Sequence, residues 1–244
     1  MATVTERIKV EMRELWEEHS KVYKNGLSRV NVYREGAKIL EDMLPKCSGG
    51  RIHEGGCGDG YWMIRHLIKC EANEIVGTDF SNKMLELARR HLQNLECALA
   101  SRIIIKEMDL LSNWPEGTFD LQIFQMLFCY LPYQGWKKVL EKAAETTLPG
   151  GYICSSNFVE GCNFRKIYRE HLLETLKMNP FFYIPFLIKT RPFTRKIDYG
   201  LRQGVLKYPS PDELLEYHQR VGFKVIEVKE FFWGEGIVVK AKMI

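Results

Sequence analysis

The chain has 244 residues, which fits one α/β domain with a substantial core and a small insertion. Apolar residues make up 45% and charged residues 27%, so the composition excludes a disordered chain, and a net charge of +4 does not by itself indicate nucleic acid. The most apolar stretch, residues 180–188, contains two prolines and is about half the length of a membrane span.

The seven cysteines form no C-x-x-C pair, and most lie in apolar or helical stretches. We therefore expect reduced, buried thiols and a cytoplasmic protein. The first fifteen residues are charged and lack the apolar core of a secretory signal. The six histidines are scattered without metal-binding spacing, so we expect no metal site.

Two helices are expected at the start of the chain, over about residues 5–24 and 30–43. In the first, Trp16, His19 and Tyr23 recur at i, i+3 and i+7 and therefore share one face. That face is either a lid over a binding site or an ordinary core contact.

Strand-like and helical runs then alternate, which predicts a parallel sheet with helices on both faces. Ser81 is a favourable N-cap, and Leu148-Pro149-Gly150-Gly151 is expected to form a turn before the fifth strand. The strand-like runs are Arg51–Glu54, Glu74–Asp79, Arg102–Lys106, Phe119–Phe124 and Tyr152–Asn157, and the helical runs are Tyr61–Lys69, Asn82–His91 and Gln134–Thr147.

The end of the chain predicts one more helix and a hairpin. Ser210 and Pro211 give the N-cap and first position of a helix that Gly222 ends. Two closing strands, residues 223–229 and 237–242, are joined by a short glycine-rich link, which favours an antiparallel pair.

A glycine-rich loop follows the first strand. Gly56, Gly58 and Gly60 form a G-x-G-x-G pattern, which lets the backbone approach a ligand and take up positive φ. The next helix points its N-terminal N–H groups toward the same place. Nineteen residues after Gly60, the second strand ends at Asp79, where a carboxylate can accept hydrogen bonds from ribose hydroxyls.

The loop differs from the dinucleotide fingerprint G-x-G-x-x-G. Its third glycine comes one residue early, and the acidic Glu54 in front of it would repel a phosphate. S-adenosylmethionine (SAM) has an amino group, a sulfonium and no phosphate. The pattern therefore favours SAM over NAD(P), and the alternative is a glycine-rich turn with no ligand.

With these motifs in order, the chain resembles a class I SAM-dependent methyltransferase of the small-molecule kind over residues 45–158 and 209–243. The resemblance implies a Rossmann-like α/β fold with a seven-stranded, mostly parallel sheet of order 3-2-1-4-5-7-6, helices on both faces, and helical caps. The matching segments are Glu54–Gly60, Val76–Ser81, Met108-Asp109-Leu110, Phe119-Asp120-Leu121 through Leu131-Pro132, and Leu148–Gly151.

The resemblance also assigns roles to residues. Glu54 and the loop would hold the methionine part of SAM, Asp79 would bind the ribose, and Phe80 would pack on the adenine. Asp109 would accept from the exocyclic amine, and Gln125 would lie near the methionine part. The predicted cofactor residues are Glu54, Gly56, Cys57, Gly58, Gly60, Asp79, Phe80, Met108, Asp109, Leu110 and Gln125. Cys129-Tyr130 stands where many relatives have a histidine pair, so histidine catalysis at that point is absent.

Residues 160–208 hold ten Lys or Arg against four Asp or Glu, a balance of +6, interleaved with aromatic residues. We interpret this segment as an inserted lid over an apolar acceptor that can carry an anionic group. A helical insertion with a solvated basic face, a membrane-binding surface and a nucleic-acid face are the alternatives, and nucleic acid is the weakest of them because no RNA-module signature is present.

The sequence thus predicts an N-terminal cap (residues 1–44), a methyltransferase core (45–159 and 209–244) and an inserted cap (160–208). The enzyme would transfer the SAM methyl group to a small molecule and release S-adenosylhomocysteine. Candidate catalytic residues are His19, Tyr23 and Tyr130, and candidate acceptor contacts are Trp16, Phe182, Phe186, Arg191 and Arg195. Methylation of a lipid at a membrane surface and a SAM-binding regulator without turnover remain the alternative functions.

Overall fold

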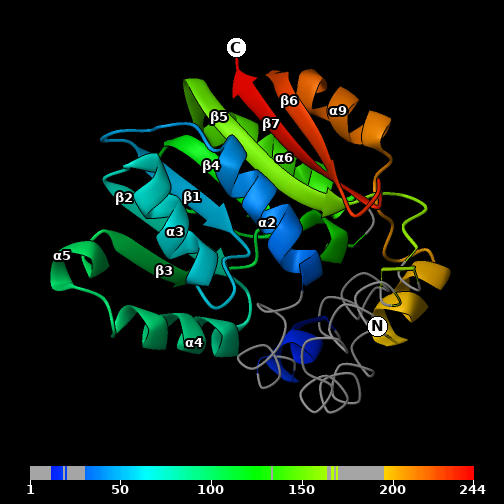
Figure 1. Cartoon of the computed structure of the whole chain (residues 1–244), viewed down its shortest axis with the longest axis horizontal. Helices are drawn as coiled ribbons and strands as arrows, with labels where there is room; N and C mark the ends of the chain where they lie inside the picture. Colours follow the sequence, from blue (N-terminus) through cyan, green and yellow to red (C-terminus); the bar gives the residue numbers. More distant parts are fainter. Residues whose placement is uncertain are drawn as a thin grey trace.

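The computed structural model describes residues 12–18, 20, 31–132, 134–163, 166–167, 169 and 195–244. Their centre is a seven-stranded sheet of order β3-β2-β1-β4-β5-β7-β6 (Figure 1). Strands β1 to β5 pair in parallel, and β7 is antiparallel to both β5 and β6, so the predicted strand order is confirmed. The strands are β1 Arg51–Gly55, β2 Glu74–Asp79, β3 Ile103–Glu107, β4 Phe119–Gln125, β5 Thr147–Phe158, β6 Phe223–Phe231 and β7 Gly236–Met243.

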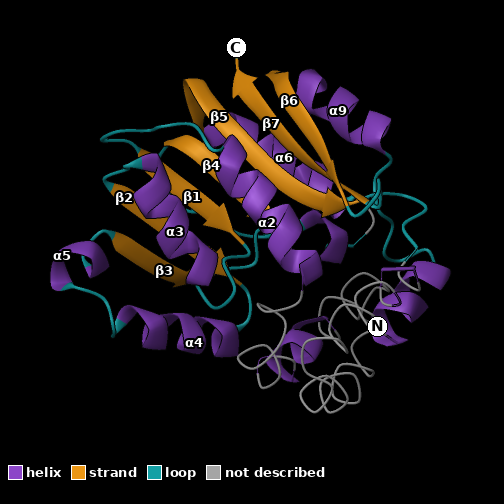
Figure 2. Cartoon of the chain, viewed as in Figure 1, coloured by secondary structure: helices purple, strands orange, loops and turns teal. Residues whose placement is uncertain are grey.

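Helices cover both faces of the sheet, as Figure 2 shows. One buried cluster joins α2, α3 and α4 to the sheet, and a second joins α6 and α9 to its other face. Residues 12–18, 20 and 195–202 are also helical. The remaining bounds are α2 Asn31–Met43, α3 Tyr61–Cys70, α4 Asn82–Leu92, α5 Cys97–Ala100, the 3₁₀ helix η2 Phe128–Tyr130, α6 Gly135–Thr146 and α9 Pro211–Arg220.

Local sequence signals fix several of these helices. The Ser81 side chain accepts a hydrogen bond from the Met84 N–H, and Ser210 accepts from the Glu213 N–H, so both predicted N-caps are present. Helix α3 buries one face every three or four residues, at Met63, His66, Leu67 and Cys70. Helix α2 lies within the predicted N-terminal cap and packs against β5, β6 and β7. The boundaries of both caps stay predictions.

The turn predicted at residues 148–151 is not where the fifth strand starts. Strand β5 begins earlier, because Thr147 pairs with Phe119 of β4 and pairing resumes at Leu121 with Tyr152. The intervening residues 148–151 bulge out of the ladder, with Gly150 at φ 77°. The Pro-Gly-Gly signal was correct about an interruption, but the sheet continues on both sides of it.

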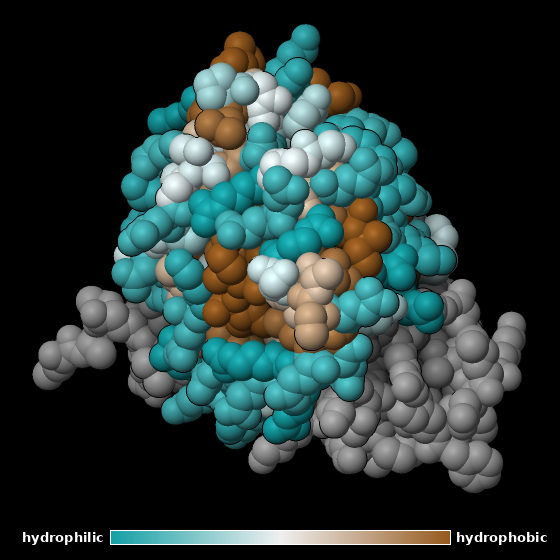
Figure 3. Space-filling view, turned by 90° about the vertical axis from the view of Figure 1, so that its left-hand side faces the viewer, coloured by the Kyte–Doolittle hydropathy of each residue, from teal (hydrophilic) through white to brown (hydrophobic). Residues whose placement is uncertain are grey.

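The α5 helix and η2 were not anticipated, because four- and three-residue helices leave no periodic signal in a sequence. Figure 3 shows the side that carries β3, where apolar side chains gather in the middle of a mostly hydrophilic surface. Leu99 of α5 and Ile104 and Ile105 of this edge strand are partly exposed. Among the helices that the structure describes, none has the length and hydropathy to cross a bilayer.

Candidate active site

A cavity of about 350 Å³ opens at the carboxyl ends of the parallel strands. It lies between the neighbouring strands β1 and β4, from which successive strands are added in opposite directions across the sheet. Such a switch point is the usual ligand position in open α/β sheets. Its volume is at the lower end of the range for small-molecule sites. Its walls come from the ends of β1, β2 and β4, the segment after β3, and the N-terminal helix.

The glycine-rich loop between β1 and α3 forms the floor of this cavity. Gly56, Gly58 and Gly60 all have positive φ, at 70°, 56° and 72°, which a side chain would oppose. The N–H groups of Gly56 and Cys57 donate to the Thr78 carbonyl at 2.7 and 3.0 Å. The loop is therefore tied to the end of β2, and the predicted backbone conformation is present.

Asp79 is held from both sides at the end of β2. One carboxylate oxygen accepts from the Gly58 N–H at 3.0 Å, and the other accepts from the Ser81 N–H at 2.9 Å. Burial raises the pKa of Asp79 to about 6, and the nearby Glu17 carboxylate adds to that rise. Two backbone N–H groups thus orient the Asp79 carboxylate at the cavity wall, and neither donor carries a positive charge.

Glu54 ends β1 in the same wall and is 2% exposed. One of its oxygens lies 2.7 Å from Nδ1 of His66, which comes from the buried face of α3. Asp59 is also buried and lines the cavity, and burial raises the pKa of its carboxyl. Cys57 lies between them in the loop, where burial raises the thiol pKa well above its ordinary value, so this cysteine is a packing group.

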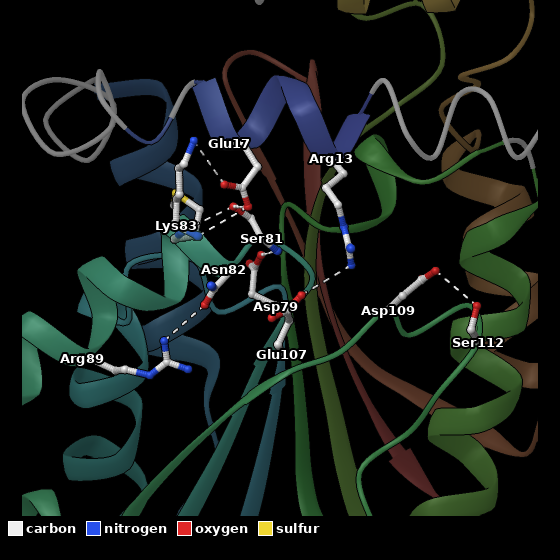
Figure 4. Close-up of polar contacts among 11 residues, drawn as sticks. Arg13, Glu17, Asp79, Ser81, Asn82, Lys83, Arg89, Glu107, Asp109 and Ser112 are labelled. Carbon is white, nitrogen blue, oxygen red and sulfur yellow. Dashed lines mark hydrogen bonds and ion pairs between the residues drawn. The ribbon is translucent and has the colours of Figure 1, made fainter.

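The segment after β3 completes the polar wall. The Met108 N–H donates to the Asp79 carbonyl at 2.9 Å, which fixes this segment beside the end of β2. Asp109 accepts from the Leu111 N–H at 2.9 Å and from the Ser112 hydroxyl at 3.2 Å. Its carboxylate therefore has a defined orientation next to the cavity (Figure 4).

The N-terminal helix closes the cavity from above, as Figure 4 shows. Glu17 accepts from the Ser81 hydroxyl at 3.0 Å and forms an ion pair with Lys83 at 3.6 Å. Arg13 forms a 3.8 Å ion pair with Glu107 and lies over the Phe80 ring, 6.0 Å from its centroid. Sequence segments more than sixty residues apart thus meet around the ribose-binding candidate Asp79.

Much of the cavity lining is apolar. Trp16 of the N-terminal helix meets Tyr130 edge to face, with ring centroids 5.1 Å apart at 87°. Both residues line the cavity, so Trp16 of the predicted face points into it, whereas His19 and Tyr23 of that face lie outside the described residues. Other apolar lining residues include Leu111, Met126, Leu127, Leu131 and Pro132.

The structure thus brings most of the predicted site residues together. Gly60 does not line the cavity: it precedes α3, where a side chain would meet Ala88, 3.1 Å from its Cβ position. Arg195 is exposed and is not among the lining residues. His19, Tyr23, Phe182, Phe186 and Arg191 lie outside the described residues. The predicted residues that line the cavity are Trp16, Glu54, Gly56, Cys57, Gly58, Asp79, Phe80, Met108, Asp109, Leu110, Gln125 and Tyr130.

Sequence reasoning missed several lining residues. Met12 and Arg13 lie four and three positions before Trp16, so helical spacing alone places them on its face. Asp59 and Trp62 border the glycine loop and could have been found from that position. The carboxylates Glu54, Asp59, Asp79 and Asp109 outnumber the one cation, Arg13, among the described lining residues. This balance fits a ligand that carries positive charge, as SAM does with its ammonium and sulfonium groups.

Comparisons with known proteins agree with this site. Residues 52–151 match the family model described as a methyltransferase domain. Residues 52–151 are thus a methyltransferase domain, and the protein is an enzyme that transfers the methyl group of SAM.

Individual relatives have low sequence identity to this chain but align with most of its length. A demethylmenaquinone methyltransferase of Geobacillus sp. (strain WCH70) is 24% identical and aligns over 88% of this chain and 90% of its own length. A Haloferax volcanii methyltransferase solved with the Trm112 activator has a TM-score of 0.65 at 12% identity, covering 93% of this chain and 96% of that one. Magnesium protoporphyrin IX methyltransferase from Synechocystis, solved with S-adenosylhomocysteine, has a TM-score of 0.63 at 14% identity, covering 97% and 100%. The two solved structures therefore show that this chain shares their fold.

Proposed function

We propose that this methyltransferase acts on a small apolar or amphipathic molecule that binds against the contacting rings of Trp16 and Tyr130. The apolar wall of the cavity is the observation that supports this acceptor class, because aliphatic and aromatic side chains surround the space beyond the carboxylates. Burying an acceptor ring there would contribute about 25 cal/mol for each Å² of apolar surface removed from water. A strongly polar acceptor would find few partners on that side.

In this arrangement the cofactor occupies the acidic part of the cavity. Asp79 accepts from the two ribose hydroxyls, Glu54 faces the ammonium group, and Phe80 and Asp109 contact the adenine. Gln125 ends β4 and lines the same cavity. The sulfonium methyl group would then point toward the Trp16–Tyr130 side.

The reaction is an in-line displacement at the methyl carbon. The acceptor atom forms a bond to that carbon while the carbon–sulfur bond breaks, and its electron pair stays on sulfur to give S-adenosylhomocysteine. Alignment and exclusion of water are the main contributions that the protein must make, because sulfonium is already a good leaving group.

A quinol ring is the acceptor that we would test first. The demethylmenaquinone methyltransferase relative aligns over nearly its whole length, and its name gives demethylmenaquinone as the molecule that it methylates. A reduced quinone ring is flat and apolar, which suits contact with the edge-to-face aromatic pair.

The test measures release of S-adenosylhomocysteine with reduced demethylmenaquinone of short side chain, and with a ring-free amphipathic amine as the comparison acceptor. Trp16→Ala should raise the acceptor KM by about tenfold, as expected for losing one buried aromatic contact, with a much smaller change in SAM affinity. Tyr199→Ala is the matched control, because Tyr199 is 64% exposed and does not line the cavity. Turnover of the amine alone would contradict a ring acceptor. SAM binding without turnover of any acceptor would favour a regulator, and turnover that requires anionic vesicles would favour the lipid alternative.

A further inference from the structure

The contact between Glu54 and His66 carries a consequence for cofactor recognition. The carboxylate and the imidazole are both buried, with side-chain exposures of 3% and 0%, and they lie 2.7 Å apart. Glu54 comes from the end of β1, and His66 comes from the second turn of α3. Burying two such polar groups costs free energy unless they form a hydrogen bond with each other.

Glu54 is held differently from the other acids of the cavity. Asp59, Asp79 and Asp109 each accept a hydrogen bond from a backbone N–H, so the loop conformation itself orients them. The hydrogen bond that Glu54 accepts comes from a side chain, the imidazole of His66. The direction of this one carboxylate therefore depends on the identity of a single helical residue.

Only one ring nitrogen of His66 has a hydrogen-bond partner among the described residues. Nδ1 faces the Glu54 carboxylate, whereas Nε2 is buried without a hydrogen-bond partner. A buried N–H without an acceptor costs more than a buried lone pair without a donor, which favours the tautomer with the proton on Nδ1. The Nδ1–H group of His66 then donates to the Glu54 carboxylate and fixes its direction.

The surroundings of His66 fix its ring. Trp62 lies nearly parallel to the imidazole, at 26° with centroids 6.3 Å apart, and Trp62 itself lines the cavity. The Arg65 guanidinium lies 5.3 Å from the centre of the Trp62 ring, and Glu41 of α2 pairs with that guanidinium at 2.9 Å. The imidazole is therefore packed in place rather than free to rotate.

We infer that His66 is a positioning residue for the amino-acid end of the cofactor: it aims the Glu54 carboxylate at the ammonium group of SAM. This inference rests on the proposed role of Glu54. It goes beyond that role because it assigns the orientation of the carboxylate, and with it the preference for a ligand with an ammonium group, to a residue that does not line the cavity.

The experiment compares two ligands that differ only at the amino-acid end. S-adenosylhomocysteine has the ammonium group, whereas 5′-methylthioadenosine shares the adenosine and the thioether but lacks the ammonium. Calorimetry on the full chain gives both affinities. The matched variants are His66→Asn, whose amide nitrogen replaces Nδ1, and His66→Gln, whose amide nitrogen replaces Nε2 and points away from Glu54.

We expect His66→Gln to weaken S-adenosylhomocysteine binding by about fivefold or more, in line with loss of a hydrogen bond to a charged group. The affinity for 5′-methylthioadenosine should stay within about twofold, and His66→Asn should retain most of the S-adenosylhomocysteine affinity. Equal losses for both ligands would overturn the inference, because they would show a general disturbance of the loop. Unchanged S-adenosylhomocysteine affinity in His66→Gln would also overturn it.

Glu54→Gln separates this inference from the proposed function. If Glu54→Gln weakens S-adenosylhomocysteine and His66→Gln does not, the role of Glu54 stands and that of His66 fails. If Glu54→Gln leaves the affinity unchanged, the assignment of Glu54 to the ammonium group is wrong and the inference fails with it. A double variant that is no weaker than Glu54→Gln alone would support the inference, because the two residues then act through one contact.

Discussion

Acidic residues at the amino ends of the parallel strands (the amino edge) have different partners from those at the carboxyl ends (the carboxyl edge). At the amino edge, Glu74 forms an ion pair with Arg51, and Asp120 accepts from the Arg51 N–H at 2.8 Å. At the carboxyl edge, Asp79 accepts from two backbone N–H groups and Glu54 accepts from an imidazole. Glu74 at the amino edge is thus paired with a cation, whereas N–H groups hold the cavity-lining acids Asp79 and Glu54.

This difference explains how a stable sheet can carry an acidic cavity. The amino-edge contacts join β1 to β2 and β4 and contribute to the fold. The carboxyl-edge acids stay available for a cationic ligand because neutral donors hold them in place. Variants at the carboxyl edge should therefore change cofactor affinity, and variants at the amino edge should change stability.

The largest effect is expected at Asp79. Asp79→Ala removes a carboxylate that would accept two charge-assisted hydrogen bonds, each contributing roughly 1.5–3 kcal/mol. SAM affinity measured by calorimetry should fall by tenfold or more, with the far-UV circular dichroism unchanged. Asp198→Ala is the control, because Asp198 is exposed and outside the cavity. Equal SAM affinities in the two variants would remove Asp79 from the cofactor site.

A second large effect is expected in the loop. Gly58→Val places a branched side chain at φ 56°, where it strains the backbone by roughly 1–3 kcal/mol and intrudes on the cavity. SAM affinity should fall by about tenfold or more. Gly204→Val is a matched control with φ 67° and open space around it. If both variants lose stability equally and both still bind SAM normally, the loop is only a turn.

The pH dependence of SAM binding follows from burial of Asp79. Its pKa of about 6 in the ligand-free protein means that the carboxyl is ionised above this value and protonated below it. The ionised form accepts the ribose hydrogen bonds, so SAM affinity should be constant above about pH 7 and fall by up to tenfold per pH unit below about pH 6. Titration calorimetry between pH 5 and 8 tests this, and Asp79→Asn should flatten the profile. A wild-type profile that is flat across this range would contradict it.

Glu17 should shift that profile by a smaller amount. Its negative charge adds to the rise in the Asp79 pKa. Glu17→Gln removes the charge and keeps an acceptor for the Ser81 hydroxyl, so the midpoint of the pH profile should move to lower pH. The measurement is the same titration on this variant. A midpoint that moves upward would show that Glu17 affects Asp79 through something other than its charge.

The smallest effect is expected at the amino edge. Arg51→Ala removes a partly exposed ion pair with Glu74 and the stacking of the guanidinium on Phe119, 4.7 Å away. Unfolding in urea should show a loss of roughly 1 kcal/mol or less, with SAM affinity within about twofold. A large loss of SAM affinity with unchanged stability would break the distinction between the two edges.

Much of the cofactor site was predictable because its signals are local. The loop from Glu54 to Gly60 and the acidic end of β2 each lie within a few residues of chain, and their backbone requirements can be deduced from glycine spacing. The strands were predictable for a similar reason, because a short apolar run between two amphipathic helical segments is typical of a buried strand. The interruption at residues 148–151 was predicted correctly, but the start of the fifth strand was not, because a Pro-Gly-Gly run does not show whether pairing exists on both sides of it.

The sequence by itself determined the strands, the glycine loop and the place of Asp79 at a strand end, because each depends on neighbouring residues, whereas the strand order was implied by the family resemblance. Only the tertiary structure decided that Arg13 and Trp16 cover the cavity and that His66 meets Glu54. His66 occupies an ordinary core position of an amphipathic helix, and nothing in the spacing of twelve residues shows that a strand end will lie beside it. Such contacts depend on how a helix packs against the sheet, which the free energy of the whole core sets.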